Sequence, residues 1–391
     1  MEYISAREAA ARWGAHIRVV QNLCRAGRVP GARKYGNVWM LPENAAKPDD
    51  PRRERRRQLG SRPDYDGSGL LTMSSVSLPK GCTVSPEALG AQAQHQQLAA
   101  EFAFLRGDLA TAAGAFELVG RSSDTTLCAL TLTMAAASRT DDWQRFSEAD
   151  EFLQSIYHTP RERDRKLAEV ALSTALLSQF ATELAPQWIL DGYFSYVPVE
   201  ARPMSVYLYA KSLQARQRSN ELIGVCKTAR ALWARDDSFT MLDVYLSLLL
   251  AGACRSQNDG AGCRRALEQA AEMAFPYGFI TPFAEYRQLM PEDMDALLHD
   301  LAPELTEPVQ ALGEQIWQDW NRFHMRFIRE HLDTLLTPQE HHAARHLAKG
   351  LSFRETAREL GITQSALKAT LASVCQKLYI SDRSELGRFF L

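Results

Sequence analysis

The sequence of 391 residues contains no uninterrupted apolar run of about 18 residues, the length that a membrane-spanning helix needs. Its first residues lead into a helix-forming stretch without the apolar region of a secretory signal, so we expect a cytoplasmic protein without membrane association. The seven cysteines are odd in number and include no Cys-x-x-Cys pair. They are expected to be free thiols, and redox sensing is the less favoured alternative.

Catalytic and nucleotide-binding motifs are also missing. No phosphate-binding loop of the form Gly-x4-Gly-Lys-Ser/Thr is present, and residues 224–228, the nearest segment, lack both its spacing and a preceding strand. No Gly-x-Ser-x-Gly or paired-carboxylate pattern stands out. His341 and His342 fall within an expected helix, where clustered histidines are mostly surface residues. The sequence therefore predicts neither an enzyme nor a cofactor or metal site.

The small net charge of −2 hides a strong internal asymmetry. Residues 1–58 hold 13 Lys and Arg against 6 Asp and Glu, and residues 337–391 hold 8 against 5. Residues 59–336 hold 24 against 36 and are therefore acidic. Basic ends favour binding to phosphates, whereas an acidic middle is repelled by the same polyanion. This partition favours nucleic-acid binding at the two ends and another role between them.

The last 56 residues carry the signals of four short helices. Thr337-Pro338 with Glu340 forms a capping box that starts a helix, and Ser352 with Glu355 repeats it. Gly350 and Gly361 are expected to end these two helices, and Thr363 to begin a longer one after a turn of about three residues. The long helix has an apolar stripe that should be buried, formed by Leu367, Leu371, Val374 and Leu378. Its outer side carries small and polar residues: Ser365, Lys368, Ala369, Ala372, Ser373 and Gln376, flanked by Gln364 and Thr370.

This segment resembles the LuxR-type helix-turn-helix over about 55 residues. The matching elements are Leu336-Thr337 with Glu340, then Gly350, Ser352, Glu355 and Ala357, then Ala366-Leu367-Lys368, Lys377-Leu378, Arg383 and Glu385. It departs from the family pattern at Phe353-Arg354, Ala366 and Thr370. The resemblance implies a helix in the DNA major groove, with Gln364, Ser365 and Lys368 at bases or adjacent phosphates and Lys377 at the backbone. The alternative is a helical bundle that makes only protein contacts.

The N-terminal segment predicts a second small helical module. Ser5 and Glu8 form a capping box ahead of an alanine-rich helix, and Gly14 and Gly27 bound the next helix. Ile17, Val20, Leu23 and Cys24 should be buried in that second helix, whereas Arg18, Asn22 and Arg25 share its outer face. Residues 33–41 then predict a two-stranded hairpin around Gly36-Asn37.

This arrangement resembles the small winged helix of the excisionase and MerR-like families. The resemblance implies that Arg18, Asn22 and Arg25 face bases or nearby phosphates and that Arg33 and Lys34 lie on the wing. A solvated charged face is the alternative.

Between these ends, residues 47–85 are rich in Pro, Gly, Ser and charge and are expected to be a flexible basic linker. Residues 86–331 predict successive helices, with turns at residues 107–108, 141–142, 182–183, 219–220 and 258–259. Ala112 and Phe116 have the small-aromatic pairing of helical hairpins, so this part resembles tetratricopeptide repeats and the repeats of maltose-regulator-type transcription factors. Its aromatic residues, such as Trp188, Trp233, Trp317 and Trp320, either pack the repeats or line a ligand groove.

We therefore expect a mainly α protein with four parts. These are a winged helix-turn-helix at residues 1–46, the linker at 47–85, a repeat solenoid at 86–331 and a four-helix LuxR-type module at 335–391. The expected function is sequence-specific binding of double-stranded DNA in transcription regulation, with a small-molecule inducer or protein partner on the solenoid and formation of a homodimer. The alternative function is a repeat scaffold whose terminal modules mediate assembly.

Overall fold

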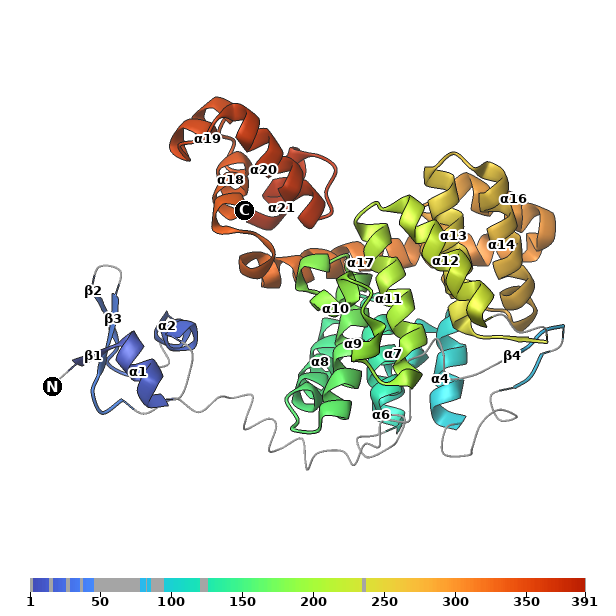
Figure 1. Cartoon of the computed structure of the whole chain (residues 1–391), viewed down its shortest axis with the longest axis horizontal. Coiled ribbons are helices and arrows are strands. Elements are labelled where there is room, and N and C mark those ends of the chain that lie inside the picture. Colours follow the sequence, from blue (N-terminus) through green and yellow to red (C-terminus); the bar gives the residue numbers. More distant parts are fainter. Residues whose placement is uncertain are drawn as a thin grey trace. The chain divides into compact units, whose positions relative to one another are not determined.

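The computed structural model describes residues 3–13, 17–25, 29–35, 38–45, 78–81, 83–85, 95–119, 126–233 and 237–390. These residues are mainly helical, as the sequence predicts, and divide into two compact units, residues 1–62 and 63–391 (Figure 1). No helix in the described ranges combines the length and the apolar character required to cross a membrane.

The N-terminal unit combines two helices with a small antiparallel sheet. Its elements are β1 (Tyr3–Ser5), α1 (Ala6–Trp13), α2 (Ile17–Arg25), β2 (Arg33–Tyr35) and β3 (Val38–Pro42). The capping box that begins α1 is confirmed, because the Ser5 amide donates to Glu8 Oε2 at 2.7 Å and the Glu8 amide donates to Ser5 Oγ at 3.2 Å. The core of the unit contains small side chains of α1 with Val20, Cys24, Val29 and Leu41. The expected boundaries at Gly14, Gly27 and Gly36-Asn37 lie outside the described residues.

The sheet of this unit has three strands in the order β1-β3-β2, one more than the predicted hairpin. The additional strand pairs Tyr3 with Pro42 and Ser5 with Met40. Three residues are too few to show an alternating pattern in the sequence, and their partners lie almost 40 residues away. Arg12 fixes α1 to the end of the sheet through an ion pair with Glu43 at 2.7 Å.

The second unit consists of helices that follow one another in hairpins (Figure 1). The helices of its larger part are α4 (His95–Leu105), α5 (Leu109–Ala113), α6 (Ala115–Val119), α7 (Thr126–Ala137), α8 (Trp143–Tyr157), α9 (Glu162–Ser178), α10 (Gln187–Leu190), α11 (Arg202–Ala215), α12 (Ser219–Trp233), α13 (Met241–Ser256), α14 (Gly260–Ala274), α15 (Thr281–Arg287), α16 (Pro291–Leu301) and α17 (Thr306–Leu335). Helix α7 packs on α8, α11 on α12 and α13 on α14, and α11 also packs on α13. One continuous apolar core therefore runs through successive hairpins.

The turns between paired helices share one local structure. Gly107, Asp141 and Asn258 have φ angles of 94°, 54° and 61°, which are left-handed values that Gly, Asn and Asp adopt most readily. The aspartate that follows each of them caps the next helix with its side chain, as at Asp108. The turns predicted at these positions are confirmed. The turn expected at residues 219–220 comes slightly earlier, because α12 already begins at Ser219.

The interior of the first hairpins also follows the sequence pattern. Ala112 is fully buried, and the Phe116 ring lies 5.2 Å from that of Phe152. The small side chain at Ala112 allows helices to approach closely, and the aromatic pair fills the space beside it.

The predicted extent of the linker needs correction at its end. Residues Leu78–Pro79 form β4, which pairs with β5 (Ser238–Phe239) of the helical unit. Leu78 is 2% exposed, and the Tyr277 hydroxyl donates to the Pro79 carbonyl at 2.9 Å. The chain is thus anchored before residue 85, because Leu78 gains burial and the Pro79 carbonyl gains a donor. At the other end, α17 continues without a break through residue 331 to Leu335.

Candidate nucleic-acid interface

The described chain after α17 forms four α-helices and a short 3-10 helix, and each of the first three α-helices begins with a side-chain cap. They are α18 (Pro338–Ala348), α19 (Phe353–Glu359) and α20 (Gln364–Lys377), followed by η8 (Arg383–Leu386) and α21 (Gly387–Phe390) (Figure 1). Oxygens of Thr337, Ser352 and Thr363 accept from the amides three residues later, at 3.2, 3.2 and 3.1 Å. Both predicted capping boxes are confirmed. Each cap satisfies an amide at the helix end that has no partner within the helix.

Two glycines set the turns between these helices. Gly350 has φ 86° and Gly361 has φ 66°, both in the left-handed region. A β-branched or bulky residue would be strained there, so the sequence meets a backbone requirement at each helix end. Only residues 360–363 separate α19 from α20, which brings the two helices together as a tight pair.

Helix α20 has one buried side and one exposed side. Leu367, Val374 and Leu378 are each fully buried, and Leu371 is half-buried. Leu367 packs with Ala343 of α18 and Ala357 of α19 in a small core of its own. The predicted apolar stripe is therefore confirmed, and it fixes the rotation of α20 about its axis.

The opposite side of α20 carries the expected candidates Gln364, Ser365 and Lys368, all of them exposed. Between them the surface is formed by exposed alanines, Ala366, Ala369 and Ala372. The Thr370 hydroxyl donates to the Ala366 carbonyl at 3.0 Å, within the helix itself. This side therefore carries small side chains, among which Lys368 is an exposed cation.

Lys377 has a different environment from the other candidates. Its Nζ lies 2.8 Å from Glu340 Oε2, and its side chain is 18% exposed. Glu340 also accepts from Ser373 Oγ at 2.6 Å and from the Thr337 amide at 2.8 Å. One carboxylate thus caps α18 and holds the last turns of α20 against it. Lys377 thus helps to position α20 against α18, and its contact with the DNA backbone stays a prediction.

The pKa of Glu340 reflects the same contacts. Burial by itself raises the pKa of this carboxyl, but hydrogen bonds from Lys377, Ser373 and Thr337 outweigh burial and lower it to about 2. Glu340 is therefore ionised throughout the neutral and mildly acidic range. The capping role of Glu340 could be predicted from its spacing to Thr337, whereas its contact with a lysine 37 residues later could not.

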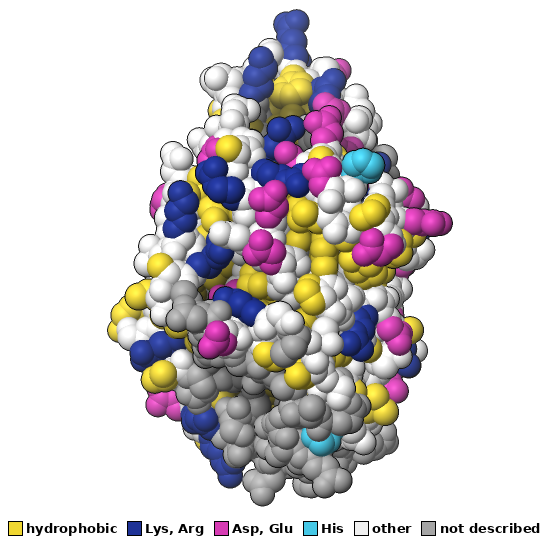
Figure 2. Space-filling view, turned by 90° about the vertical axis from the view of Figure 1, so that its right-hand side faces the viewer, with side chains coloured by type: hydrophobic (Ala, Val, Ile, Leu, Met, Phe, Trp, Pro, Cys, Tyr) yellow, Lys and Arg dark blue, Asp and Glu magenta, His cyan; other side chains and the backbone are white. Residues whose placement is uncertain are grey.

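Two cations of α19 were absent from the predicted set. Arg354 and Arg358 stand one helical turn apart and are exposed, and neither forms an ion pair with another described residue. Their spacing of four residues places both on one side of the helix. Figure 2 shows Lys and Arg side chains at the upper end of the molecule, where the C-terminal helices lie, interspersed with Asp and Glu. The spacing of four residues between the two arginines could have identified them as candidates from the sequence.

In the N-terminal unit the structure describes three of the five predicted contact residues. Arg25 is exposed at the end of α2, and Arg33 and Lys34 are exposed on β2. These last two pair in the sheet with Met40 and Trp39 of β3. The side chains of Arg18 and Asn22 lie outside what the structure describes. The described part of this unit thus presents cations on both its second helix and its hairpin.

An aromatic cluster, which we call the aromatic joint, connects the end of α20 to the larger helical part. It consists of Phe180, Trp320, His324 and Tyr379. The rings of Phe180 and Tyr379 are stacked at 4.2 Å with 3° between their planes, and Trp320 stacks on His324 at 4.6 Å. Trp320 Nε1 donates to the Ser178 carbonyl at 3.1 Å. Tyr379 lies two residues after the end of α20, so the position of α20 is tied to α9 and α17 through this joint.

His324 is the titratable member of the joint. It is 4% exposed, and its Nδ1 lies 3.3 Å from Gln179 Oε1. Burial lowers the pKa of this imidazole to about 4, although the nearby Leu378 backbone acts in the opposite direction. The ring is therefore neutral at physiological pH, and its protonation would place a charge inside the joint.

Comparison with known proteins gave no matching family model, no matching curated protein and no matching solved structure.

Proposed function

We propose that this chain is a sequence-specific DNA-binding transcriptional regulator, with α19 and α20 acting as a helix-turn-helix of the LuxR type. Helix α20 enters the major groove, where Gln364, Ser365 and Lys368 meet bases or adjacent phosphates. Arg354 and Arg358 of α19 meet the phosphate backbone, as the first helix of such a pair does. The larger helical part acts as a repeat solenoid of the tetratricopeptide type that receives a signal.

One observation carries the proposal: α20 has an exposed side of small residues, yet its position is fixed by a buried stripe, three capped helix starts and the Glu340 contacts. A helix that serves only as packing has no need for an exposed side of alanines beside Lys368. A reading helix needs both a rigid support and a surface that the groove can admit.

The N-terminal unit supplies a second, smaller contact in the proposal. It would act as a winged helix of the excisionase and MerR-like kind, with Arg25 on its helix and Arg33 and Lys34 on the wing. The exposure of these three cations supports this role. Together the two modules would extend the footprint on DNA beyond the half-site of a single reader.

The test begins by selecting bound duplexes from a random-sequence library with the full chain. Fluorescence anisotropy then measures the affinity for a selected duplex and for a random 40-base-pair duplex over a range of salt concentrations. We expect tighter binding to the selected duplex and a steep loss of affinity with salt. The Lys368→Met change should weaken specific binding by about 1–3 kcal/mol. The double change Arg354→Ala and Arg358→Ala should lower the salt slope by about two.

Lys227→Met is the matched control, because Lys227 is an exposed lysine on α12, away from these helices. If the full chain selects no duplex, the assembly scaffold becomes the better function. If duplexes are selected but Lys368→Met behaves like Lys227→Met, the assignment of α20 as the reading helix is wrong.

A further inference from the structure

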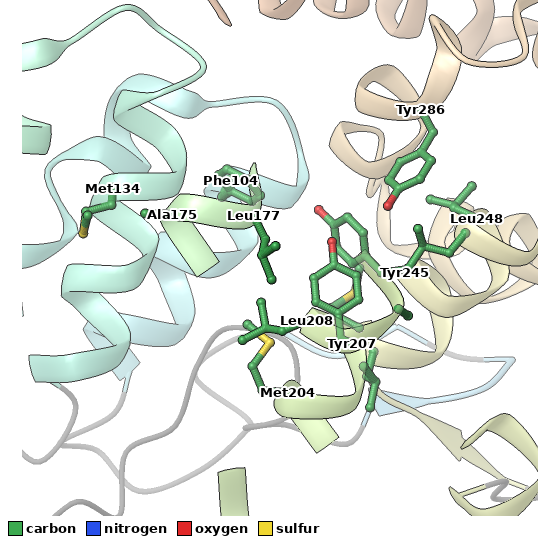
Figure 3. Packing of buried hydrophobic residues seen from close by; sticks show 14 of the residues in the cluster. Phe104, Met134, Ala175, Leu177, Met204, Tyr207, Leu208, Tyr245, Leu248 and Tyr286 are labelled. Atoms are coloured by element: carbon green, nitrogen blue, oxygen red, sulfur yellow. The ribbon is translucent and has the colours of Figure 1, made fainter. Parts of the chain in front are cut away.

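A cavity lies inside the second unit, lined by residues of α4, α7, α9, α11, α13, α15 and α17. Its volume is about 140 Å³, and it is partly open to solvent. We call it the tyrosine pocket, after Tyr207, Tyr245 and Tyr286, whose hydroxyls face a common interior space (Figure 3). None of the predicted DNA contacts lies in its wall. Of the four tryptophans considered from the sequence, Trp317 and Trp320 line this space.

The three tyrosines are unusually deep for polar side chains. Tyr207 is 6% exposed, and Tyr245 and Tyr286 are each 3% exposed. The Tyr286 hydroxyl lies near Tyr207 but has no partner with hydrogen-bond geometry among the described residues. A buried hydroxyl without a partner costs free energy, which a ligand with an acceptor oxygen would recover. Burial raises the pKa of all three hydroxyls, so they remain protonated donors.

Lys211 supplies a cation to the same pocket. Its Nζ lies 3.2 Å from Gln214 Oε1, 5.1 Å from the Phe180 ring centre and 5.5 Å from the Tyr286 ring centre. An ammonium group has three N–H donors, and Gln214 accepts one of them. Burial lowers the pKa of Lys211 to about 8, with Glu285 acting against that shift and Arg139 adding to it. The amine therefore stays mostly protonated at pH 7.

The other charges of the wall are already engaged. Arg139 donates to Glu285 through Nε and to the Ala135 carbonyl through Nη1 at 2.6 Å. Glu101 accepts from Gln97 at 2.8 Å. The Arg139–Glu285 pair is neutral as a whole, so Lys211 is the cation of the described wall that forms no ion pair. A ligand that satisfies Lys211 and Tyr286 together needs an anionic oxygen.

Most of the rest of the wall is apolar, although Thr131, Thr174, Ser178 and Gln288 also line it. Phe104, Leu177, Leu208 and Ile316 contribute their side chains, and Trp317 and Tyr379 stand at the edge with 42% and 41% exposure. These surfaces favour an aliphatic or aromatic body, since polar groups placed there would lose water without a partner.

We propose that the tyrosine pocket binds a small organic carboxylate with an apolar body, whose carboxylate is held by Lys211 and the Tyr286 hydroxyl. Phe180, Trp320 and Tyr379 belong both to this pocket and to the aromatic joint, so the ligand would contact residues that support α20. An effect of the ligand on DNA reading rests on the proposed function, whereas binding of the carboxylate does not.

Isothermal titration calorimetry on the full chain, without DNA, tests the proposal. The ligands are phenylacetate, 4-phenylbutyrate and octanoate, each paired with its neutral amide. At least one carboxylate should bind, and its amide should bind at least tenfold more weakly. Lys211→Met should reduce the carboxylate affinity tenfold or more and abolish the preference over the amide. Tyr286→Phe should reduce it about threefold to tenfold, and Lys211→Arg should keep the preference.

The matched controls are Lys227→Met and Tyr193→Phe, which alter an exposed lysine and an exposed tyrosine. Tyr286→Phe removes a hydroxyl without a partner, so this variant should fold as the unchanged chain does, which circular dichroism checks. The proposal is overturned if no carboxylate binds, if the amides bind equally well, or if the controls lose as much affinity as the pocket variants. Failure of DNA binding alone would leave these results intact.

Discussion

The aromatic joint should make the stability of the helical unit depend on pH through His324. Its imidazole is neutral and buried in the folded chain, with a pKa near 4 in place of the usual 6.5. In the unfolded chain the same group binds a proton as the pH falls below 6.5. As the pH falls, His324 therefore binds a proton in the unfolded state before it does in the folded state. The unfolding free energy has its full value above pH 6.5 and decreases as the pH falls toward 4.

The size of the effect follows from the two pKa values. Their difference corresponds to a total loss of about 3 kcal/mol once the pH is well below 4, and to about 2 kcal/mol at pH 5. Glu340 contributes little at pH 5, because its unfolded pKa of 4.5 and its folded pKa of about 2 place its own loss at lower pH. The interval between pH 7.5 and pH 5 consequently isolates the histidine from that carboxylate.

Urea denaturation of the full chain, followed by far-ultraviolet circular dichroism, would measure this loss at pH 7.5 and pH 5. Other groups titrate in the same interval, so the comparison is with His324→Gln and with His342→Gln, which alters an exposed histidine of α18. The decrease in unfolding free energy should be about 2 kcal/mol smaller in His324→Gln than in the unchanged chain. In His342→Gln the decrease should equal that of the unchanged chain. Equal decreases in all three chains would refute the buried, neutral state of His324.

Four further predictions concern the C-terminal helices, each measured as unfolding free energy in urea. Glu340→Gln should lower the unfolding free energy by about 3 kcal/mol at pH 7, because it removes the ion pair with Lys377. The loss should become smaller as the pH falls from 4.5 toward 2, since the carboxyl of the unchanged chain then becomes protonated. A loss that is constant with pH would show that the ionised carboxylate is not its cause. Ser352→Ala should cost about 1 kcal/mol by removing a helix cap, whereas a cost near zero would mean that water replaces it. Gly361→Ala should lower the unfolding free energy by about 1 kcal/mol, because alanine is strained at the left-handed φ of 66°. No atom lies within 4 Å of the added methyl group, so a steric clash adds nothing to this loss. A stabilised variant would contradict the left-handed backbone. Tyr379→Ala should cost about 1 kcal/mol from the lost ring stack, and an unaffected stability would mean that the joint does not hold α20.

Local features of the fold could be predicted because the residues that determine them are close in sequence. Capping boxes such as Ser352 with Glu355 join residues three positions apart, and Gly350 and Gly361 each occur where the φ angle of one residue is positive. The buried stripe of α20 repeats every three or four residues. For the same reason the helix boundaries of the C-terminal segment agree with the sequence pattern.

Contacts between distant residues could not be predicted in this way. Strand β1 depends on a partner almost 40 residues away, and β4 pairs with a strand about 160 residues later. The tyrosine pocket draws on residues between 101 and 379, and no local spacing marks them. Lys377 illustrates the limit for a candidate site: its sequence position suggests a phosphate contact, and only the fold brings Glu340 to it.

Helix α17 extends for 30 residues; residues between Gly313 and Trp320 of its first half line the tyrosine pocket, and its end leads to α18. At 1.5 Å per residue it measures roughly 45 Å, and its uninterrupted hydrogen bonds make it a stiff lever. Tilting such a lever by about 5° displaces its far end by about 4 Å, close to the 3.4 Å rise between neighbouring base pairs. If α20 reads DNA as proposed, a rearrangement of a few degrees among the hairpins would be enough to move it by about one base-pair step along a duplex.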